Sequence, residues 1–411
     1  MINDKINYSQ YDLIEKTIIK FLSKKCASFE AIFKKCYGLY PLDLKQILHK
    51  LENDGKIIRL SNSKYTLIEK KKNTNYIRSI NHKKLILPKP HLYDFDWRFT
   101  ESTISSISKN ILADISETDV ILLLGAPSIL AELLLYEPTP NVILIDNNRS
   151  VIDFFKKNVT SSNVSVYRKN LLQDKWNSTR KIEKVFFDAP WYLEHYIAFL
   201  CQASLVTNIG STLESTLYSL NTRPEAYSER NRIIEVSQLL GFSLESIEKN
   251  VINYKTPDFE KSSLKSAGIN LIKDWRTADL VKMIKYKQVK NEKINQIMNS
   301  IVKNNEKNEW HDFYHKKHKI MIKGPFDDYN VRPKLIRIEK NDVLSSVSRK
   351  YDKRSVVDLW ISDNRVYKIE GKSSFLHALL ILSKKNIPLK LMKNTQQHID
   401  EALSYLNDML S

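Results

Sequence analysis

The chain has 411 residues, 42% of them apolar, and a formal net charge of +18. This length predicts two or three domains with sizeable cores. No apolar run reaches the ~18 residues of a membrane span, and the N-terminus lacks the apolar core of a secretory signal. These features exclude a membrane-spanning or signal-bearing class, and we expect a cytoplasmic protein with no membrane partner.

The three cysteines, Cys26, Cys36 and Cys201, form no CxxC pair. This excludes a disulfide framework and a zinc knuckle, and we expect buried, reduced thiols. The excess of basic residues indicates a partner that carries phosphate groups, because lysine and arginine neutralise phosphates and release counterions. Nucleic acid is the partner that this charge favours; the alternative is that the abundance of Lys, like that of Asn and Ile, reflects the composition bias of the source genome.

The N-terminal module has the pattern of three helices and a hairpin. Apolar residues recur at helical spacing over 11–24, and Ser28 is a residue type that caps a second helix. Pro41 suits the first position of a third helix, which continues over 42–53. Two short apolar runs on either side of 61–64 then predict a strand, a turn and a strand.

This order of elements resembles the winged-helix superfamily of DNA-binding modules. The resemblance implies that the third helix enters the major groove and that the hairpin adds contacts. Acids on or beside the third helix favour the alternative, a winged helix that binds protein. The nucleic-acid contacts that the resemblance implies are Lys45, His49, Lys50, Arg59 and Lys64.

A lysine-rich connector and a stiff Leu87-Pro-Lys-Pro90 segment lead to Tyr93–Thr100, where aromatic and charged residues alternate. One interpretation is that this last segment covers a ligand pocket, with Asp96 or Arg98 in contact with the ligand. The alternative is that its aromatic residues pack against the edge of a sheet; these are Phe95, Trp97 and Phe99.

The next part of the chain alternates between strand and helix patterns, which predicts an α/β fold with a doubly wound sheet. Helices are expected near 128–136, 149–158, 191–203 and 224–240. Strands are expected near 120–124, 142–146, 164–167, 184–188 and 212–220, followed by an antiparallel pair near 246–254 and 266–272.

Three residues stand at the ends of these strands: Gly125, Asp146 and Asp188. Ligands of such sheets bind beyond the carboxyl ends of the strands, so we expect a nucleotide-type cofactor there. The structural alternatives are that Asp146 caps the next helix, and that 188–191 is only a turn with Trp191 in the core.

The layout resembles the class I S-adenosylmethionine-dependent methyltransferase fold. The resemblance implies that Gly125 lets the backbone approach the cofactor and that Asp146 binds its ribose hydroxyls. Asp188-Ala-Pro190-Trp191-Tyr192 resembles the (Asp/Asn)-Pro-Pro-(Tyr/Phe/Trp) motif of amino-methylating enzymes. That motif implies that Asp188 accepts a hydrogen bond from the target amine and that Trp191 stacks on the base.

The same region is also similar to the N4-bis(aminopropyl)spermidine synthase family of branched-polyamine synthases, which place a winged-helix module before a related fold. This second resemblance implies transfer of an aminopropyl group from decarboxylated S-adenosylmethionine to a polyamine. The acids that follow the glycine in that family are absent from Ala126-Pro-Ser128. The resemblance is carried by Arg98-Phe-Thr100, Leu124-Gly-Ala-Pro-Ser128, Ile145-Asp146 and Asp188-Ala-Pro190.

Dense lysines and a partial apolar stripe over 281–323 predict a basic connector helix that lies along nucleic acid or a partner domain. His311, His315 and His318 have helical spacing there, but no acid or cysteine completes a ligand set, and we expect no metal. The stretch Gly371-Lys-Ser-Ser374 lacks the earlier glycine of a phosphate loop.

The remaining sequence predicts a small α+β domain, which we expect to contact a protein partner. Its strands are expected near 334–338, 356–361 and 365–369, and its helices near 374–384 and 395–410. The predicted division is a winged helix (1–70), a linker and lead-in (71–116), a Rossmann-like domain (117–280), a helical connector (281–323) and an α+β domain (324–411).

Three functions remain open from the sequence. The first is a methyltransferase that acts on an amino group, in nucleic acid for example. The second is an aminopropyltransferase, and the third is a binding scaffold without activity.

Overall fold

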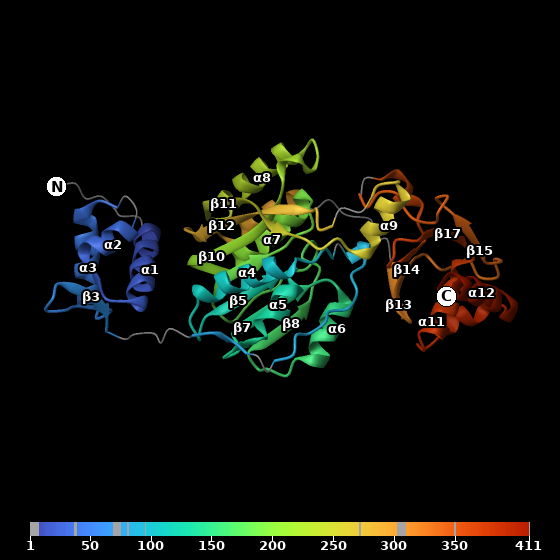
Figure 1. Ribbon diagram of the computed structural model, residues 1–411, viewed down its shortest axis with the longest axis horizontal. Helices are drawn as coiled ribbons and strands as arrows, with labels where there is room; N and C mark the ends of the chain where they lie inside the picture. Colours follow the sequence, from blue (N-terminus) through green and yellow to red (C-terminus); the bar gives the residue numbers. More distant parts are fainter. Residues whose placement is uncertain are drawn as a thin grey trace. The chain divides into compact units, whose positions relative to one another are not determined.

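The structure is a computed structural model that describes residues 8–36, 39–68, 75–79, 82–94, 96–270, 273–301, 310–348 and 351–410. The chain divides into two compact units (Figure 1). The first comprises Met1–Leu87, Phe99–Asn253 and Thr277–Lys303. The second comprises Pro88–Arg98, Tyr254–Arg276 and Asn304–Ser411. The units therefore differ from the predicted division, because two internal segments belong with the C-terminal part of the chain.

The N-terminal module contains the expected helices and hairpin. Ser28 caps the second helix, since its hydroxyl accepts a hydrogen bond from Ala31 N at 3.3 Å. The predicted hairpin is joined by one further short strand, which gives the antiparallel order β1-β3-β2. The elements are α1 (Tyr8–Lys24), β1 (Ala27–Ser28), α2 (Phe29–Lys35), α3 (Pro41–Asn53), β2 (Ile57–Arg59) and β3 (Lys64–Leu67).

A seven-stranded sheet forms the centre of the first unit, with the order β11-β12-β10-β9-β5-β7-β8. Its strands are parallel except for β12, which is antiparallel to both neighbours. This confirms the predicted α/β sheet. The strands are β5 (Val120–Leu124), β7 (Asn141–Asp146), β8 (Val164–Arg168), β9 (Ile182–Phe187), β10 (Thr207–Tyr218), β11 (Phe242–Asn253) and β12 (Thr277–Lys285).

Helices cover both faces of this sheet (Figure 1). On one face, alternate residues of the strands share a buried cluster with α7, α8 and α10. The other face includes Phe186, whose ring contacts Phe99 just before α4 at a centroid distance of 6.2 Å. The helices are α4 (Glu101–Ala113), α5 (Pro127–Leu133), α6 (Arg149–Asn158), α7 (Leu193–Val206), the short η2 (Leu220–Thr222), α8 (Ala226–Leu239) and α10 (Asn291–Ile301), and β4 (Ile77–Arg78) pairs with β6 (Tyr136–Glu137).

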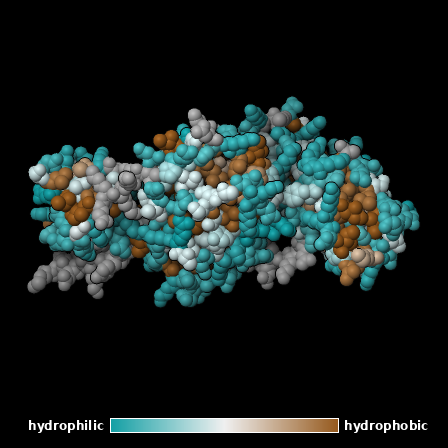
Figure 2. Space-filling view, turned by 90° about the horizontal axis from the view of Figure 1, so that it is seen from below, coloured by the Kyte–Doolittle hydropathy of each residue, from teal (hydrophilic) through white to brown (hydrophobic). Residues whose placement is uncertain are grey.

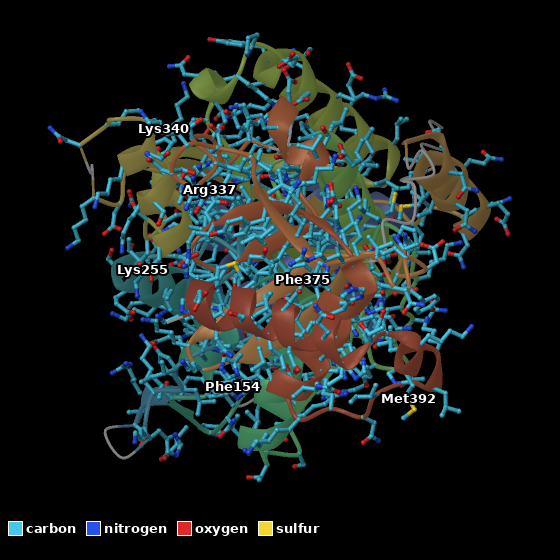
Figure 3. The ribbon with its side chains drawn as sticks, turned by 90° about the vertical axis from the view of Figure 1, so that its right-hand side faces the viewer. Phe154, Lys255, Arg337, Lys340, Phe375 and Met392 are labelled. Atoms are coloured by element: carbon cyan, nitrogen blue, oxygen red, sulfur yellow. The ribbon has the colours of Figure 1, made fainter. Side chains whose placement is uncertain are left out.

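The second unit is built on an antiparallel sheet with the order β13-β14-β16-β17-β15. In Figure 3, which faces this unit, Phe375 lies within the fold and Met392 at its periphery. The strands are β13 (Trp310–His315), β14 (His318–Lys323), β15 (Lys334–Arg337), β16 (Leu359–Ile361) and β17 (Val366–Glu370). The helices are α9 (Asp258–Ser266), α11 (Lys372–Leu382) and α12 (Gln396–Leu410), with short 3-10 turns η1 (Leu92–Asp94), η3 (Asp352–Val356) and η4 (Leu389–Lys393).

The prediction of a helix over 281–323 was wrong for most of that range. Only α10 is helical, whereas β12 extends to Lys285 and the hairpin β13–β14 occupies 310–323; residues 302–309 lie outside the described part of the chain. His315 and His318 are therefore cross-strand partners of a hairpin rather than neighbours on a helix. The spacing of the three histidines therefore does not place them on one side of a helix.

The last strand of the large sheet was also misplaced by the sequence. Residues 258–266 form α9, and the strand expected near 266–272 lies instead at 277–285. Ser263 on α9 donates a hydrogen bond to Leu344 O at 2.6 Å and accepts one from Asn364 Nδ2 at 2.8 Å. Because these partners belong to the second unit, the segment leaves the large sheet to complete another core.

The three cysteines agree only in part with the expectation that all of them are buried. Cys201 is buried, and burial raises the pKa of its thiol to about 12, whereas Cys26 and Cys36 are half-buried. The face drawn in Figure 2 is mostly hydrophilic, with smaller hydrophobic areas. Among the described helices, none combines the length and the apolar composition needed to cross a membrane.

Candidate active site at the carboxyl edge of the large sheet

Gly125 lies where three neighbouring strands end. Its N–H donates a hydrogen bond to Ile145 O at 2.9 Å, and Asp188 N donates one to Leu124 O at 3.1 Å. Gly125 has a φ of +62°, and a Cβ atom there would lie 2.9 Å from Asp188 O and 3.2 Å from the Phe199 ring. Any larger residue would therefore strain the backbone and push the β5 and β9 ends apart.

Asp146 ends β7, the strand next to β5, and is half-buried. Its carboxylate Oδ1 accepts a hydrogen bond from Asn148 N at 2.7 Å. The residue that caps α6 is Asn148, whose side chain accepts from Ser150 N at 3.1 Å. Asp146 thus shapes the turn before the helix without capping it, and the carboxylate stays at the edge of the sheet.

Asp188 follows β9 on the other side of β5. Thr216 Oγ1, on β10, donates a hydrogen bond of 2.6 Å to Asp188 Oδ1. Thr216 is fully buried and Asp188 is half-buried. Thr216 was not predicted as a site residue; its only signal in the sequence is a threonine inside an apolar strand, where an unpaired hydroxyl would be costly.

The carboxylate of Asp188 also acts on a buried phenol. The pKa of Tyr196 on α7 is well above its ordinary value, first because the ring is buried and second because of the nearby negative charge of Asp188. Tyr196 therefore stays protonated. The hydrogen bond from Thr216 favours one orientation of the Asp188 carboxylate.

Pro190 and Trp191 form a tight turn that leads into α7. Tyr192 N donates to Pro190 O at 2.6 Å, and Trp191 packs half-buried against the core, with its ring 6.2 Å from that of Tyr218. The turn that was one alternative is thus present. Trp191 is only half-buried, so part of its surface is accessible and the turn is compatible with a binding role.

Two arginines near this edge are held in ion pairs. Arg223 pairs with Glu229 at 2.5 Å and its guanidinium lies 4.4 Å from the centre of the Tyr218 ring. Arg230 pairs with Asp279 at 2.7 Å. Burial, followed by the hydrogen bond to Glu229, raises the pKa of Tyr218. The two ion pairs neutralise the carboxylates of Glu229 and Asp279.

The lead-in segment has its own partners in the second unit. Arg98 pairs with Asp96 at 2.7 Å and also donates to Pro88 O. Trp97 packs on Phe259 with ring centres 5.0 Å apart, so the alternative of packing against the sheet edge does not hold for Trp97. Phe99 does pack on the large sheet through Phe186, as expected, and Phe95 lies outside the described residues.

The N-terminal basic residues are exposed. Lys45, His49 and Lys50 lie on α3, with Lys45 and His49 one turn apart on the same side of the helix. On the hairpin, Arg59 lies on β2 opposite Tyr65 and Lys64 begins β3. The structure places these five side chains on one small module; contact with nucleic acid stays a prediction.

The stretch Gly371–Ser374 of the second unit binds a carboxylate of the same chain. Asp328 accepts hydrogen bonds from Lys372 N at 2.6 Å and Ser373 N at 2.8 Å, at the first turn of α11. The Lys372 side chain pairs with Asp358 at 2.7 Å. A carboxylate of the chain itself thus occupies the position that a phosphate would take.

Comparisons with known proteins gave matches among solved structures only. No family model matches the sequence, and no curated protein matches it. A branched-chain polyamine synthase from Thermus thermophilus, in complex with N4-aminopropylspermidine and 5'-methylthioadenosine, is similar at 12% identity and a TM-score of 0.41, over 67% of this chain and 88% of that chain.

Two methyltransferase structures are also similar. A candidate RNA methyltransferase from Pyrococcus horikoshii matches at 18% identity and a TM-score of 0.36, over 49% of this chain and 93% of its own. A TehB-like S-adenosylmethionine-dependent methyltransferase from Corynebacterium glutamicum matches at 12% identity and a TM-score of 0.30, over 43% and 86%. Likeness at this level carries no argument about substrate or activity.

The fold follows from the strand order itself. Numbered within the domain, the strands have the order 3-2-1-4-5-7-6, with the seventh reversed between the fifth and the sixth. Gly125, Asp146 and Asp188 follow or end the first, second and fourth strands. The large domain of this chain has the class I S-adenosylmethionine-dependent methyltransferase fold.

Proposed function

We propose that the protein is an S-adenosylmethionine-dependent methyltransferase that acts on an amino group. The observation that carries the proposal is the meeting of Gly125, Asp146 and Asp188 at the carboxyl ends of three hydrogen-bonded neighbours, β5, β7 and β9. This is the edge where open α/β sheets bind their ligands.

The cofactor side of the site is formed by Gly125 and Asp146. Gly125 allows the turn after β5 to approach the Asp188 backbone closely, and the Asp146 carboxylate accepts hydrogen bonds of the kind that ribose hydroxyls donate. S-adenosylmethionine, when bound, supplies an electrophilic methyl group, whereas its decarboxylated form supplies an aminopropyl group. Both forms share the adenosyl moiety that these two residues would hold.

The target side is formed by Asp188, Pro190 and Trp191. Thr216 orients the Asp188 carboxylate, which would accept a hydrogen bond from the N–H of the target amine. Trp191 offers a half-buried aromatic face beside it. An amine is already a nucleophile, so holding it in one orientation provides most of the rate enhancement that such a site can give.

The charges near the site favour methylation over aminopropyl transfer. A polyamine is a polycation and needs carboxylates that are not already neutralised. Glu229 and Asp279, however, pair with Arg223 and Arg230. The half-buried ring of Trp191 suits a planar target better than a flexible polycation. Aminopropyl transfer is therefore the second candidate, and a scaffold without activity is the third.

The N-terminal module supports nucleic acid as the source of the amino group. We propose that it is a winged helix whose α3 and hairpin contact phosphates through Lys45, His49, Lys50, Arg59 and Lys64, all of which are exposed. Affinity for a DNA or RNA duplex should then fall steeply as salt increases. A flat salt dependence would assign this module to protein contacts. A protein partner for the C-terminal part of the chain likewise remains a proposal.

Calorimetry with three ligands tests the reaction. Preference for S-adenosylmethionine and S-adenosylhomocysteine over decarboxylated S-adenosylmethionine supports methylation, and the reverse preference supports aminopropyl transfer. Binding of none of the three leaves the scaffold. With a methyl acceptor in hand, Asp188→Ala should reduce turnover about 100-fold or more while cofactor affinity changes little, since the acid contacts the target.

A further inference from the structure

The second unit contains a cavity of about 300 Å³ where four distant segments meet. This volume lies at the lower end of the range of small-molecule sites, ~300–1,000 Å³. The lining residues come from the lead-in segment, the first residue of α9, the β13–β14 turn and the β16–β17 turn: Lys89, Pro90, Asp258, Lys317, His318, Ser362, Asp363 and Arg365. The tertiary fold alone brings them together.

The acids of this cavity are already matched by cations. Asp363 accepts a hydrogen bond from Arg365 Nε at 2.9 Å and pairs with the same guanidinium at 2.8 Å. Asp258 pairs with Lys261 at 3.0 Å. In the described parts of the chain, no carboxylate forms an ion pair with Lys89 or Lys317. The lining therefore has an excess of positive charge.

His318 is the buried group of the cavity, with 8% of its surface exposed. Burial lowers the pKa of its imidazole, and the charges of Arg365, Lys317 and Lys89 act in the same direction, against Asp363. These three cations therefore lie near enough to the ring to disfavour its protonation. An anion among them would reverse that effect and raise the pKa.

We propose that this cavity binds a small phosphate-type anion, either free phosphate or a phosphate monoester. Lys89, Lys317 and Arg365 provide the positive charge, since lysine and arginine are the side chains that bind phosphate oxygens. Ser362 adds a hydroxyl group. The ligand contacts segments that enter the unit from elsewhere in the chain, so its binding fastens Lys89 and the start of α9 to the C-terminal sheet.

The test uses the full-length chain at constant ionic strength with inorganic phosphate and with AMP as probes. Calorimetry measures affinity, and the NMR signals of the His318 ring, assigned with His318→Gln, report its pKa. We expect binding of at least one probe with an increase in the His318 pKa. Tighter binding of AMP identifies a monoester as the ligand, and equal binding identifies free phosphate.

Matched lysine variants separate the cavity from general charge effects. Lys89→Met with Lys317→Met should weaken binding by about tenfold or more for the loss of two cations. Lys384→Met with Lys390→Met removes two exposed lysines outside the cavity and should leave affinity unchanged. Thermal unfolding checks that both double variants fold. The proposal is overturned if neither probe shifts the His318 signals, or if both double variants bind alike.

Discussion

Two polar pairs, one between β9 and β10 and one between β10 and the residue that follows β9, have the same separation and different surroundings. Lys184 Nζ lies 2.6 Å from Glu214 Oε1, and each side chain is only 1% exposed. Thr216 Oγ1 also lies 2.6 Å from Asp188 Oδ1, but Asp188 is half-buried at the carboxyl edge of the sheet. The Lys184–Glu214 pair is inaccessible to any ligand, so its contribution is to the stability of the fold. Access, rather than hydrogen-bond length, thus distinguishes a candidate site residue from a structural one.

The comparison predicts the largest effect for the inner pair. Lys184→Met leaves Glu214 buried with Lys282 as its remaining cation, 3.4 Å away. We expect a loss of up to about 3–5 kcal/mol in the free energy of unfolding, because the buried Glu214 carboxylate loses its shorter ion pair and keeps only the longer one to Lys282. Urea denaturation measures it. The exposed Lys181→Met is the matched control and should change little; a loss below about 1 kcal/mol at Lys184 would refute the assignment.

Gly125→Ala should cost less, about 2–3 kcal/mol, through a left-handed backbone and a contact with Asp188 O. Gly268→Ala is the control for backbone strain alone, since Gly268 has a φ of +73° with nothing within 4 Å of a Cβ. We expect a cost of about 1–2 kcal/mol there. Equal losses in the two variants would show that the close approach of β5 and β9 is unimportant. Calorimetry on Gly125→Ala should also show weaker cofactor binding.

Lys285 extends the comparison to a buried amine that forms no ion pair with a carboxylate among the described residues. Its amine donates to Ser204 Oγ and Leu240 O, each at 2.6 Å, and burial lowers its pKa from 10.5 to about 7. Above pH 7 the unfolded state holds a proton that the folded state lacks, so stability should rise with pH between the two values. The expected slope is about 1.4 kcal/mol per pH unit at most.

Denaturation of the wild type and of Lys285→Met at several values between pH 7.5 and 9.5, inside this window, measures the difference in slope. We expect the wild type to gain stability relative to the variant as the pH rises. Parallel curves for the two proteins would mean that Lys285 stays charged in the fold.

The smallest effect is expected at Thr216. Thr216→Val removes one hydrogen bond to a carboxylate that retains contact with solvent, so the loss should be about 1–2 kcal/mol. Turnover should fall more than stability suggests, because the Asp188 carboxylate loses its fixed orientation. Thr216→Ser keeps the hydroxyl and should restore both properties. Failure of serine to restore turnover would argue against a positioning role for Thr216.

The sequence located the strand ends of the candidate site but not their partners. Gly125, Asp146 and Asp188 were identified because each stands at the end of a short apolar run, which is a local signal. Thr216 and the Arg230–Asp279 pair had no comparable signal, since they join residues on different strands and helices. Such contacts depend on the register between β9, β10 and β12.

Local sequence was sufficient to predict the helices that flank the large sheet, its first five strands, the turn at Gly125 and the helix–hairpin pattern of the N-terminal module. Apolar periodicity, caps and turn residues act over a few positions and are legible in the chain. Only the tertiary structure decided that β12 inserts antiparallel between β10 and β11, that 310–323 is a hairpin, and that 88–98 and 254–276 belong to the second unit. These outcomes depend on which distant apolar surfaces bury one another, and local sequence carries no record of that choice.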